Sequence, residues 1–388
     1  MAKMSWTLID RHADAYLEEL CVGPADVEGE ATGYSVVKRT LRGGRSEGVD
    51  VIEVDNGAFR FVVLPTRGMG VWRATLGELP LGWKSPVPGP VHPGFVRLSD
   101  PNGIGWLDGF DEMLVRCGLE SNGAPEFNDD GSLRYPLHGK IANTPAHKVE
   151  LTIDGDEGEI TVAGEVDEAR LFGNKLRLRS TYTTGVGQAG FHLVDEVTNL
   201  SAEPSELELL YHINFGTPLL RPGSKVVVPA VRLAPRDEVA MGNVPEWDTY
   251  GPETPGSPEA VFFFELAADA HGNTRALLHN SPADRGVSLK FNKNQLPCFT
   301  VWKNRQAEAD GYVTGLEPGI NFPNPKSFEK AQGRVAELAP GASRSFEITL
   351  EALGDVQSVR AACESVAKLR GDADPEVLAQ PDPIWSAG

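Results

Sequence analysis

The chain has 388 residues and a formal net charge of −19, from 55 acidic and 36 basic residues. Such a field repels the phosphates of nucleic acids and anionic membrane surfaces, so we expect neither as a partner. No apolar run approaches the roughly 20 residues that span a bilayer, and the first residues lack the order of a signal peptide. A composition of 40% hydrophobic and 23% charged residues is typical of soluble globular proteins, and we expect a cytoplasmic one.

Four cysteines, Cys21, Cys117, Cys298 and Cys363, lie far apart, without CxxC or other metal-ligand spacing. We expect free thiols, as in a reducing compartment. No motif for a metal or a redox cofactor occurs, so we expect neither. The sequence leaves the oligomeric state open.

Helical periodicity is confined to the two ends of the chain. Ile9 to Leu20 has the spacing of a short amphipathic helix, and so has Asp355 to Leu369. Residues 355–388 would then comprise this second helix and a Pro-rich tail over the surface. No repeat or linker divides the rest, which predicts a single domain over residues 1–388 with its core between about residues 30 and 354.

Between these ends, Gly and Pro punctuate many short apolar runs, which is typical of an all-β fold. Asp55-Asn56-Gly57 and Asp154-Gly155-Asp156 are predicted hairpin turns. The predicted strands lie within residues 49–65, 147–166, 174–185, 191–201, 206–216, 224–233, 260–266, 275–280, 286–292, 298–304, 311–318 and 344–353.

The segment from Leu79 to Asn143 is long and aromatic-rich, without clear strands. Long structured loops in a compact domain are usually functional, so we expect this one to wall a ligand site. The candidate wall residues are Trp83, Phe95, Trp106, Phe110, His138 and Asn143.

The strand "LELLYHINFG" carries two polar residues within an apolar run, His212 and Asn214. Side chains alternate along a strand, so Leu209, Tyr211 and their alternates face a core, whereas His212 and Asn214 share the other face. A concave sheet surface that holds a polar ligand would explain that face, and a hydrogen-bonded structural histidine is the alternative. Glu317 precedes Pro318, which favours an extended backbone at Glu317. An extended backbone would aim the Glu317 carboxylate into a cleft, and a surface glutamate before a turn is the alternative.

Five segments occur in an order that resembles the aldose 1-epimerase (galactose mutarotase-like) superfamily. They are "LHGKIANTPA", "LLYHINFG", "TVWKN", "YVTGLEPG" and "LAPGASRSFEITLEAL". With "VLPTRGMGVWRATLGELPLGWKSP", they resemble more narrowly a bacterial subfamily without an assigned function. The similarity runs from about Val51 to Leu353. It implies a β-sandwich of large, mostly antiparallel sheets with a sugar site on a concave face.

The resemblance also implies the roles of two residues. His212 would donate a proton to the ring oxygen of an aldose, and Glu317 would take the proton of the anomeric hydroxyl. Opening and closing the ring in this way interconverts the α and β anomers without a cofactor, and such acid–base assistance accelerates a step by roughly 10²–10⁴-fold.

Further sugar contacts follow from the same resemblance, for His138 and Arg67, and from the strand faces, for Trp302 and Asn214. His138 matches a histidine before glycine, and Arg67, with Arg73 as its rival, matches an arginine that binds hydroxyls. Trp302 would stack on the sugar or pack in the core, and Asn214 would bind a hydroxyl or orient the strand.

Some features depart from the best-known mutarotases. The aspartate expected between acid and base has no clear match, with Asp237 and Asp248 as candidates, so the sugar is not identified. A non-catalytic sugar-binding or sensing protein on the same fold is the main alternative. A glycosidase would need two flanking carboxylates, for which only Asp108 and Asp111 could be offered.

Overall fold

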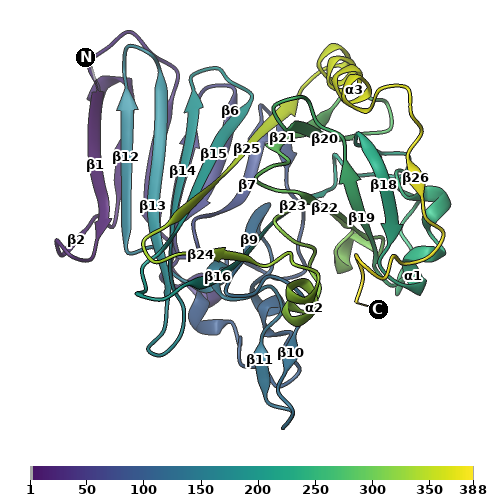
Figure 1. The fold of residues 1–388 in the computed structure, drawn as a ribbon. Coiled ribbons are helices and arrows are strands. Elements are labelled where there is room, and N and C mark those ends of the chain that lie inside the picture. Colours follow the sequence, from purple (N-terminus) through teal and green to yellow (C-terminus); the bar gives the residue numbers. More distant parts are fainter. Residues whose placement is uncertain (1–2, 388) are drawn as a thin grey trace.

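Two large sheets pack face to face in the computed structural model, which describes residues 3–387 (Figure 1). The first sheet has ten strands, in the spatial order β17 (Lys225–Val227), β20 (Asn273–His279), β21 (Gly286–Asn292), β25 (Ser343–Leu353), β15 (Gly190–Asn199), β14 (Lys175–Gly185), β13 (Glu159–Ala169), β12 (Lys148–Asp154), β1 (Lys3–Asp10) and β2 (Ala15–Tyr16). Every pairing in this sheet is antiparallel.

The second sheet has fourteen strands. Twelve follow one another in the order β26 (Glu376–Val377), β18 (Ala230–Pro235), β19 (Ala260–Leu266), β22 (Cys298–Asn304), β23 (Val313–Gly319), β16 (Ser205–Gly216), β9 (Leu114–Leu119), β7 (Gly70–Leu76), β6 (Phe59–Leu64), β5 (Asp50–Asp55), β4 (Ser35–Thr40) and β3 (Leu20–Val22). Two short strands pair at its sides, β24 (Ala336–Leu338) with β16 and β8 (Leu79–Leu81) with β7. Only the β18–β26 pair is parallel among the described residues.

The remaining elements are short. A separate hairpin joins β10 (Glu126–Phe127) to β11 (Leu133–Tyr135), and Figure 1 shows it projecting from the lower edge of the molecule. The α-helices are α1 (Glu238–Met241), α2 (Lys326–Ala331) and α3 (Val356–Arg370). The 3-10 turns are η1 (Pro24–Asp26), η2 (Gly44–Ser46), η3 (Pro93–Phe95), η4 (Gly105–Gly109), η5 (Ile141–Asn143), η6 (Val244–Glu246) and η7 (Glu308–Asp310). No helix within residues 3–387 is long and apolar enough to cross a membrane.

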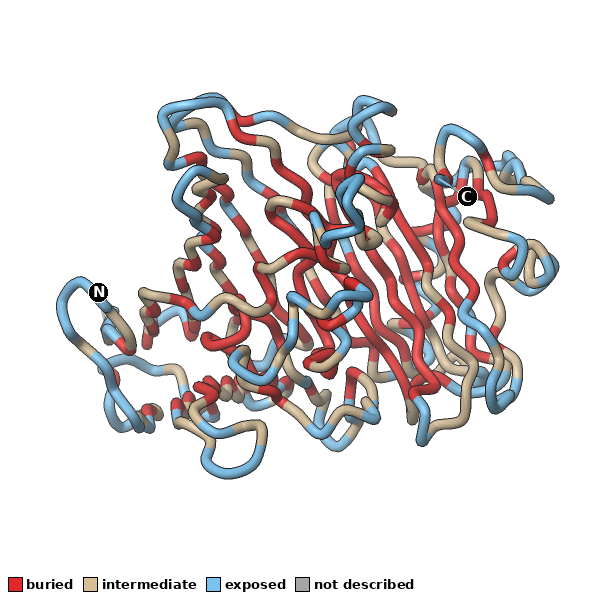
Figure 2. The backbone as a smooth tube through the Cα atoms, turned by 90° about the horizontal axis from the view of Figure 1, so that it is seen from below, coloured by how far each residue is buried: buried red, intermediate tan, exposed pale blue. Residues whose placement is uncertain are grey.

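Alternation of apolar and polar residues explains the ten-stranded sheet. In β14, Leu176, Leu178 and Tyr182 face the core, whereas Arg177 and Arg179 face outward. The central strands of the other sheet differ, since both of their faces are covered. Figure 2 shows this as long buried runs in one part of the molecule and alternating burial elsewhere.

The structure confirms the all-β class, the two hairpin turns and the C-terminal helix, which is α3 at the top of Figure 1. The helix expected over residues 9–20 is wrong. Residues 3–10 form β1 instead, which pairs with β12 and buries Leu8 in the core, and a turn follows in which the Asp10 carboxylate accepts from the amides of His12 and Ala13. The pairing with β12 therefore stabilises a strand here more than the short apolar spacing stabilises a helix.

The segment 79–143 is also more ordered than its sequence indicates, because it contains the central strand β9. This strand is hard to predict from the sequence, because the charged Arg116 and Gly118 interrupt its apolar pattern. Arg116 is buried between the sheets, where it forms a 2.5 Å ion pair with Asp195 and a 2.7 Å hydrogen bond to Ser180. A paired arginine can therefore occupy a core position.

Candidate active site

A cavity of about 250 Å³ lies on the face of the fourteen-stranded sheet that points away from the core. Strands β16, β22 and β23 form its floor, and the segment 79–143 supplies a wall. The lining residues are Trp106, Leu107, Phe110, Ala124, Leu137, His138, His212, Arg236, Glu259, Val261, Trp302, Glu317 and Pro323. The cavity therefore gathers residues from sites far apart in the sequence.

Strand β16 presents His212 to this cavity in the predicted way. Leu209, Tyr211 and Ile213 belong to the main core, whereas Leu210 packs in a smaller cluster on the opposite face. His212 lies on that opposite face and is 4% exposed. The alternation that the sequence predicts for this strand is confirmed.

Strand β23 brings Glu317 beside His212. Its Oε1 lies 3.2 Å from His212 Nε2, but the two atoms form no aligned hydrogen bond, and Oε1 has no other partner within residues 3–387. Gly315 lies between the two side chains, and a Cβ atom there would collide with the Glu317 carboxylate and approach His212 Cε1 to 3.0 Å. The glycine makes room for the pair, and both reactive atoms stay free to bond to a substrate.

Asn214 fixes the tautomer of His212. Its Nδ2 donates to the carbonyls of Glu112 (3.0 Å) and His212 (3.3 Å), so its Oδ1 must be the atom 2.6 Å from His212 Nδ1. An amide oxygen only accepts, and hence Nδ1 carries the hydrogen. Nε2 is left with a bare lone pair on the side of Glu317.

Burial sets the protonation of the pair. It lowers the pKa of His212 to about 3, helped by His138 and opposed by the hydrogen bond with Asn214. Burial also raises the pKa of Glu317 well above its usual range, and the charge of Glu259 adds to this effect. Both shifts disfavour the charged forms, so the free site favours a protonated carboxyl group beside an imidazole that can accept its proton.

His138 lies against His212, with their ring centroids 5.5 Å apart. Its backbone has a left-handed φ of 57°, and its Nδ1 lies 2.9 Å from the carbonyl of Asn122, to which it donates. Burial lowers the pKa of His138, so this ring is neutral as well and offers Nε2 as an acceptor.

Aromatic rings enclose the two histidines. The centroids of Phe110 and Trp302 lie 5.1 and 5.2 Å from that of His212, and the ring of Trp106 lies 4.7 Å from His138. Trp106 is 1% exposed, and its Nε1 has no hydrogen-bond partner within the described chain. Such walls suit the apolar faces of a sugar ring, and the indole is a donor in need of an acceptor.

Arg236 and Glu259 line the rim of the cavity, and sequence reasoning missed both. The Arg236 guanidinium contacts Glu259 at 2.9 Å and Asp237 at 2.7 Å, and Trp302 Nε1 donates to Glu259 at 2.7 Å. No motif marks these residues, because β18 and β19 bring them to the site from outside the matched segments. Within residues 3–387, no group of three or more His, Cys, Asp or Glu side chains is arranged to hold a metal ion.

Several expected site residues lie elsewhere. Arg67 is 1% exposed and does not line the cavity, since its guanidinium is paired with Glu112 at 2.6 Å. Asn214 acts behind His212 and does not reach the cavity either. Of the expected wall residues, Phe95 is exposed at the surface, and Asn143 accepts a hydrogen bond from Arg67.

The aspartates offered for sugar binding or hydrolysis also lie outside the lining. Asp237 caps α1 through the amide of Ala240, and Asp248 is not a lining residue. Asp108 pairs with Arg97 at 2.8 Å near the surface, whereas Asp111 is buried beside Trp72. The cavity does hold two carboxyl groups, Glu317 and Glu259, but Glu259 is bound to Arg236 and to Trp302 Nε1, and neither aspartate offered for hydrolysis lines the cavity.

The neutral state of His212 predicts a pH effect on stability. In the unfolded chain this histidine takes up a proton near pH 6.5, but in the folded chain only near pH 3. Between these values the unfolded state binds the extra proton, so stability falls as the pH falls, by about 1.4 kcal/mol per pH unit. Urea unfolding should therefore show that the wild type loses about 2 kcal/mol more than His212→Gln between about pH 7 and pH 5. Equal losses would contradict a neutral, buried His212.

Comparison with known proteins places this site in context. The family model described as "Domain of unknown function (DUF4432)" matches residues 46–352. Among curated proteins, none matches the chain at a significant level. The solved structure of a "putative aldose 1-epimerase" from Klebsiella pneumoniae is 34% identical in sequence, with a TM-score of 0.93, and the match covers 98% of this chain and 99% of that one.

More distant structures share the architecture alone. A galactose mutarotase-like protein from Clostridium acetobutylicum matches at 16% identity and a TM-score of 0.55, over 81% of this chain and 97% of that one. A protein from Escherichia coli K12 with the same name as the Klebsiella one matches at 15% identity and a TM-score of 0.50, over 79% and 99% of the two chains. The predicted galactose mutarotase-like fold is confirmed, and the chain belongs to the DUF4432 family.

Proposed function

We propose that the protein is an aldose 1-epimerase, which interconverts the α and β anomers of a free sugar. The observation that carries this proposal is the pair of His212 and Glu317, whose reactive atoms lie 3.2 Å apart in a cavity of sugar size. The likeness to the Klebsiella structure supports the same reaction class.

The chemistry requires one proton donor and one proton acceptor. As the donor protonates the ring oxygen and the acceptor takes the proton of the anomeric hydroxyl, the bond from C1 to the ring oxygen breaks and a C1 carbonyl forms. Rotation about C1–C2 exposes the other carbonyl face, and both protons return when the ring closes. A pair that holds a single proton can run this cycle with no net exchange with solvent.

The protonation that burial favours in the free site supports an assignment of the first step. Glu317 carries the proton and His212 Nε2 is bare, so the carboxyl group is the first donor and the imidazole is the first acceptor. This order is the reverse of the roles that the resemblance implies, and its cause is the apolar burial of both groups. In ring closure each group works in the opposite direction.

The remaining lining suits sugar hydroxyls. Trp106 Nε1 is a buried donor without a partner, and His138 Nε2 is an acceptor, so a bound sugar would satisfy both. The charge of Arg236 is balanced by Glu259 and Asp237, and thus no free cation from residues 3–387 faces the cavity. We therefore expect an uncharged aldose rather than a phosphorylated or acidic sugar.

Polarimetry tests this function directly. A pure anomer of each aldose in a panel of neutral pentoses, deoxypentoses and hexoses is dissolved with and without the protein. We expect the rate constant of the approach to equilibrium to rise in proportion to protein concentration for at least one sugar, and more than for its phosphate ester. Rates that stay at the spontaneous value across the panel would contradict the proposal.

A further inference from the structure

A second cavity, of about 360 Å³, lies on the same face of the fourteen-stranded sheet, over β5 to β8. It is larger than the cavity at His212 and lies within the range of about 300–1,000 Å³ that is usual for small-molecule sites. Its lining residues are Glu53, Arg60, Val62, Arg73, Ala74, Thr75, Pro80, Leu81, Gly82, Trp83, Lys84 and Thr217. None of them belongs to the acid–base machinery.

Positive charge distinguishes this cavity from the rest of the acidic chain. Arg60 pairs with Asp55 at 2.7 Å and with Glu53, the one carboxylate in the lining, at 3.7 Å, whereas Arg73 and Lys84 form no ion pair with a carboxylate within residues 3–387. The Arg73 guanidinium stacks on the ring of Trp72 at 4.2 Å, which positions it without neutralising it. Two uncompensated cations thus face one hollow in a protein whose net charge is −19.

Sequence order alone does not reveal the cluster, because its cations lie on three separate segments. The pairing of β6 with β7 sets Arg60 opposite Thr75, and the turn after β8 brings Lys84 to the same hollow. The floor, in contrast, is apolar, with Val62, Ala74 and Leu81. The cavity therefore combines an anion-binding rim with a floor that can cover the body of a small molecule.

We propose that this cavity binds a small phosphate monoester. The two unpaired cations match the two charges of such a group, and guanidinium groups bind phosphate through paired hydrogen bonds. The hydroxyls of Thr75 and Thr217 add donors at the same rim. Because the apolar floor covers the organic part, an ester binds more tightly than free phosphate.

The position of Trp83 makes binding observable. Its ring lines the second cavity and lies 4.9 Å from the ring of Phe110, which lines the cavity at His212. Its Nε1 donates to the carbonyl of Glu112 at 3.0 Å. The indole N–H resonance of Trp83 therefore responds to occupancy of the second cavity, and Trp385, which lines neither cavity, serves as the reference signal.

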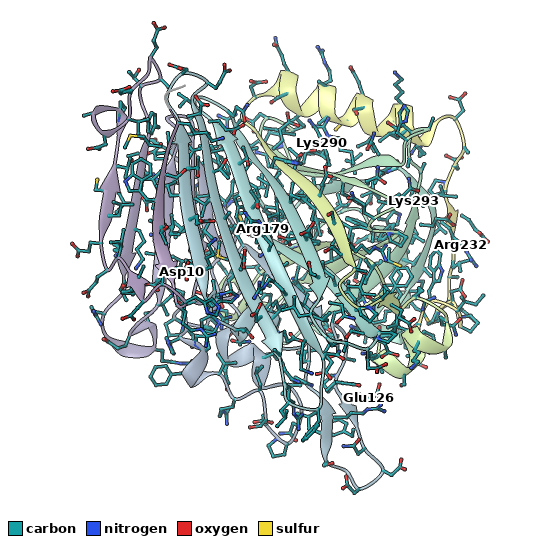
Figure 3. All side chains as sticks on the ribbon, turned by 60° about the vertical axis from the view of Figure 1, so that its left-hand side comes forward. Asp10, Glu126, Arg179, Arg232, Lys290 and Lys293 are labelled. Atoms are coloured by element: carbon teal, nitrogen blue, oxygen red, sulfur yellow. The ribbon has the colours of Figure 1, made fainter. Side chains whose placement is uncertain are left out.

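Calorimetric titration of the full chain with inorganic phosphate and with ribose 5-phosphate tests the proposal. We expect saturable binding of the ester, weaker binding of inorganic phosphate, and at least about tenfold weaker binding in Arg73→Gln/Lys84→Gln. A charge-matched control is Arg179→Gln/Lys290→Gln. Both residues, labelled in Figure 3, lie on the ten-stranded sheet, and this variant should bind as the wild type does.

Three outcomes would overturn the proposal. They are the absence of saturable binding of both probes, equal binding by the wild type and Arg73→Gln/Lys84→Gln, and equal weakening in the control variant, which would indicate an effect of net charge alone. A shift of the Trp83 indole resonance on addition of the ester supports the site independently of any variant. Mutarotase activity is not needed for any of these measurements, so the test is separate from the proposed function.

Discussion

Glu317→Gln should lower kcat/KM for anomer interconversion by at least about 100-fold. Glutamine keeps the shape of the side chain but cannot carry the proton that the cycle passes between the sugar oxygens. Since burial favours the neutral form of this carboxyl group, its replacement by a neutral amide should leave the free energy of unfolding nearly unchanged. Polarimetry and urea unfolding measure the two quantities on the same preparation.

The control for this variant is Glu347→Gln, an exposed glutamate of the ten-stranded sheet, which should keep full activity. Infrared spectroscopy adds a reading that is independent of turnover. The carbonyl stretch of protonated carboxyl groups should be weaker in Glu317→Gln than in the wild type at neutral pH, while other buried carboxyl groups such as Glu208, whose pKa burial raises to about 8, keep contributing to the band in both. Activity of Glu317→Gln within about threefold of the wild type would remove Glu317 from the mechanism.

Arg67→Met should cost about 3–5 kcal/mol of stability, because it leaves the Glu112 carboxylate buried and unpaired. Both side chains of this pair are fully buried, and Arg67 also donates to the carbonyl of Gly109 at 3.0 Å. The pair therefore anchors the segment that carries Phe110 and Trp106, behind the cavity wall. Urea unfolding at neutral pH measures the loss.

Two controls separate this role from sugar binding. Arg60→Met removes a half-exposed ion pair with Asp55 and should cost at most about 1 kcal/mol. The double variant Arg67→Met/Glu112→Leu removes both charges and should recover much of the loss. A raised KM in Arg67→Met with unchanged stability would instead favour the direct contact with a sugar that the resemblance implies.

The sequence predicts the fold well where local pattern and tertiary packing agree. Alternation in β14 and β16 places the right side chains in the core, and the position of His212 on the opposite face of β16 follows from that alternation alone. That Glu317 lies beside His212 is harder to predict, because the two residues are more than a hundred positions apart in the sequence. Only the ordered resemblance brought them together before the structure did.

Other parts of the site could not be predicted, for reasons that are physical. Whether Arg67 faces a ligand or pairs with a buried carboxylate depends on Glu112, whose position is set by β7 and β9 packing together. Arg236 and Glu259 reach the cavity through the register of β18 and β19, which no local pattern encodes. The helical spacing of residues 9–20 was overridden because β12 offered an open edge to β1.

A protein that only binds or senses sugars could share the walls of this cavity, but it would not need a pair that transfers a proton. Saturation-transfer NMR on an anomeric mixture separates the two functions, since it detects exchange between anomers at equilibrium. We predict that catalytic amounts of the protein transfer saturation between the α and β signals of a neutral aldose, and that His212→Gln and Glu317→Gln abolish the transfer. Binding of that sugar without any transfer by the wild type would contradict the mutarotase account.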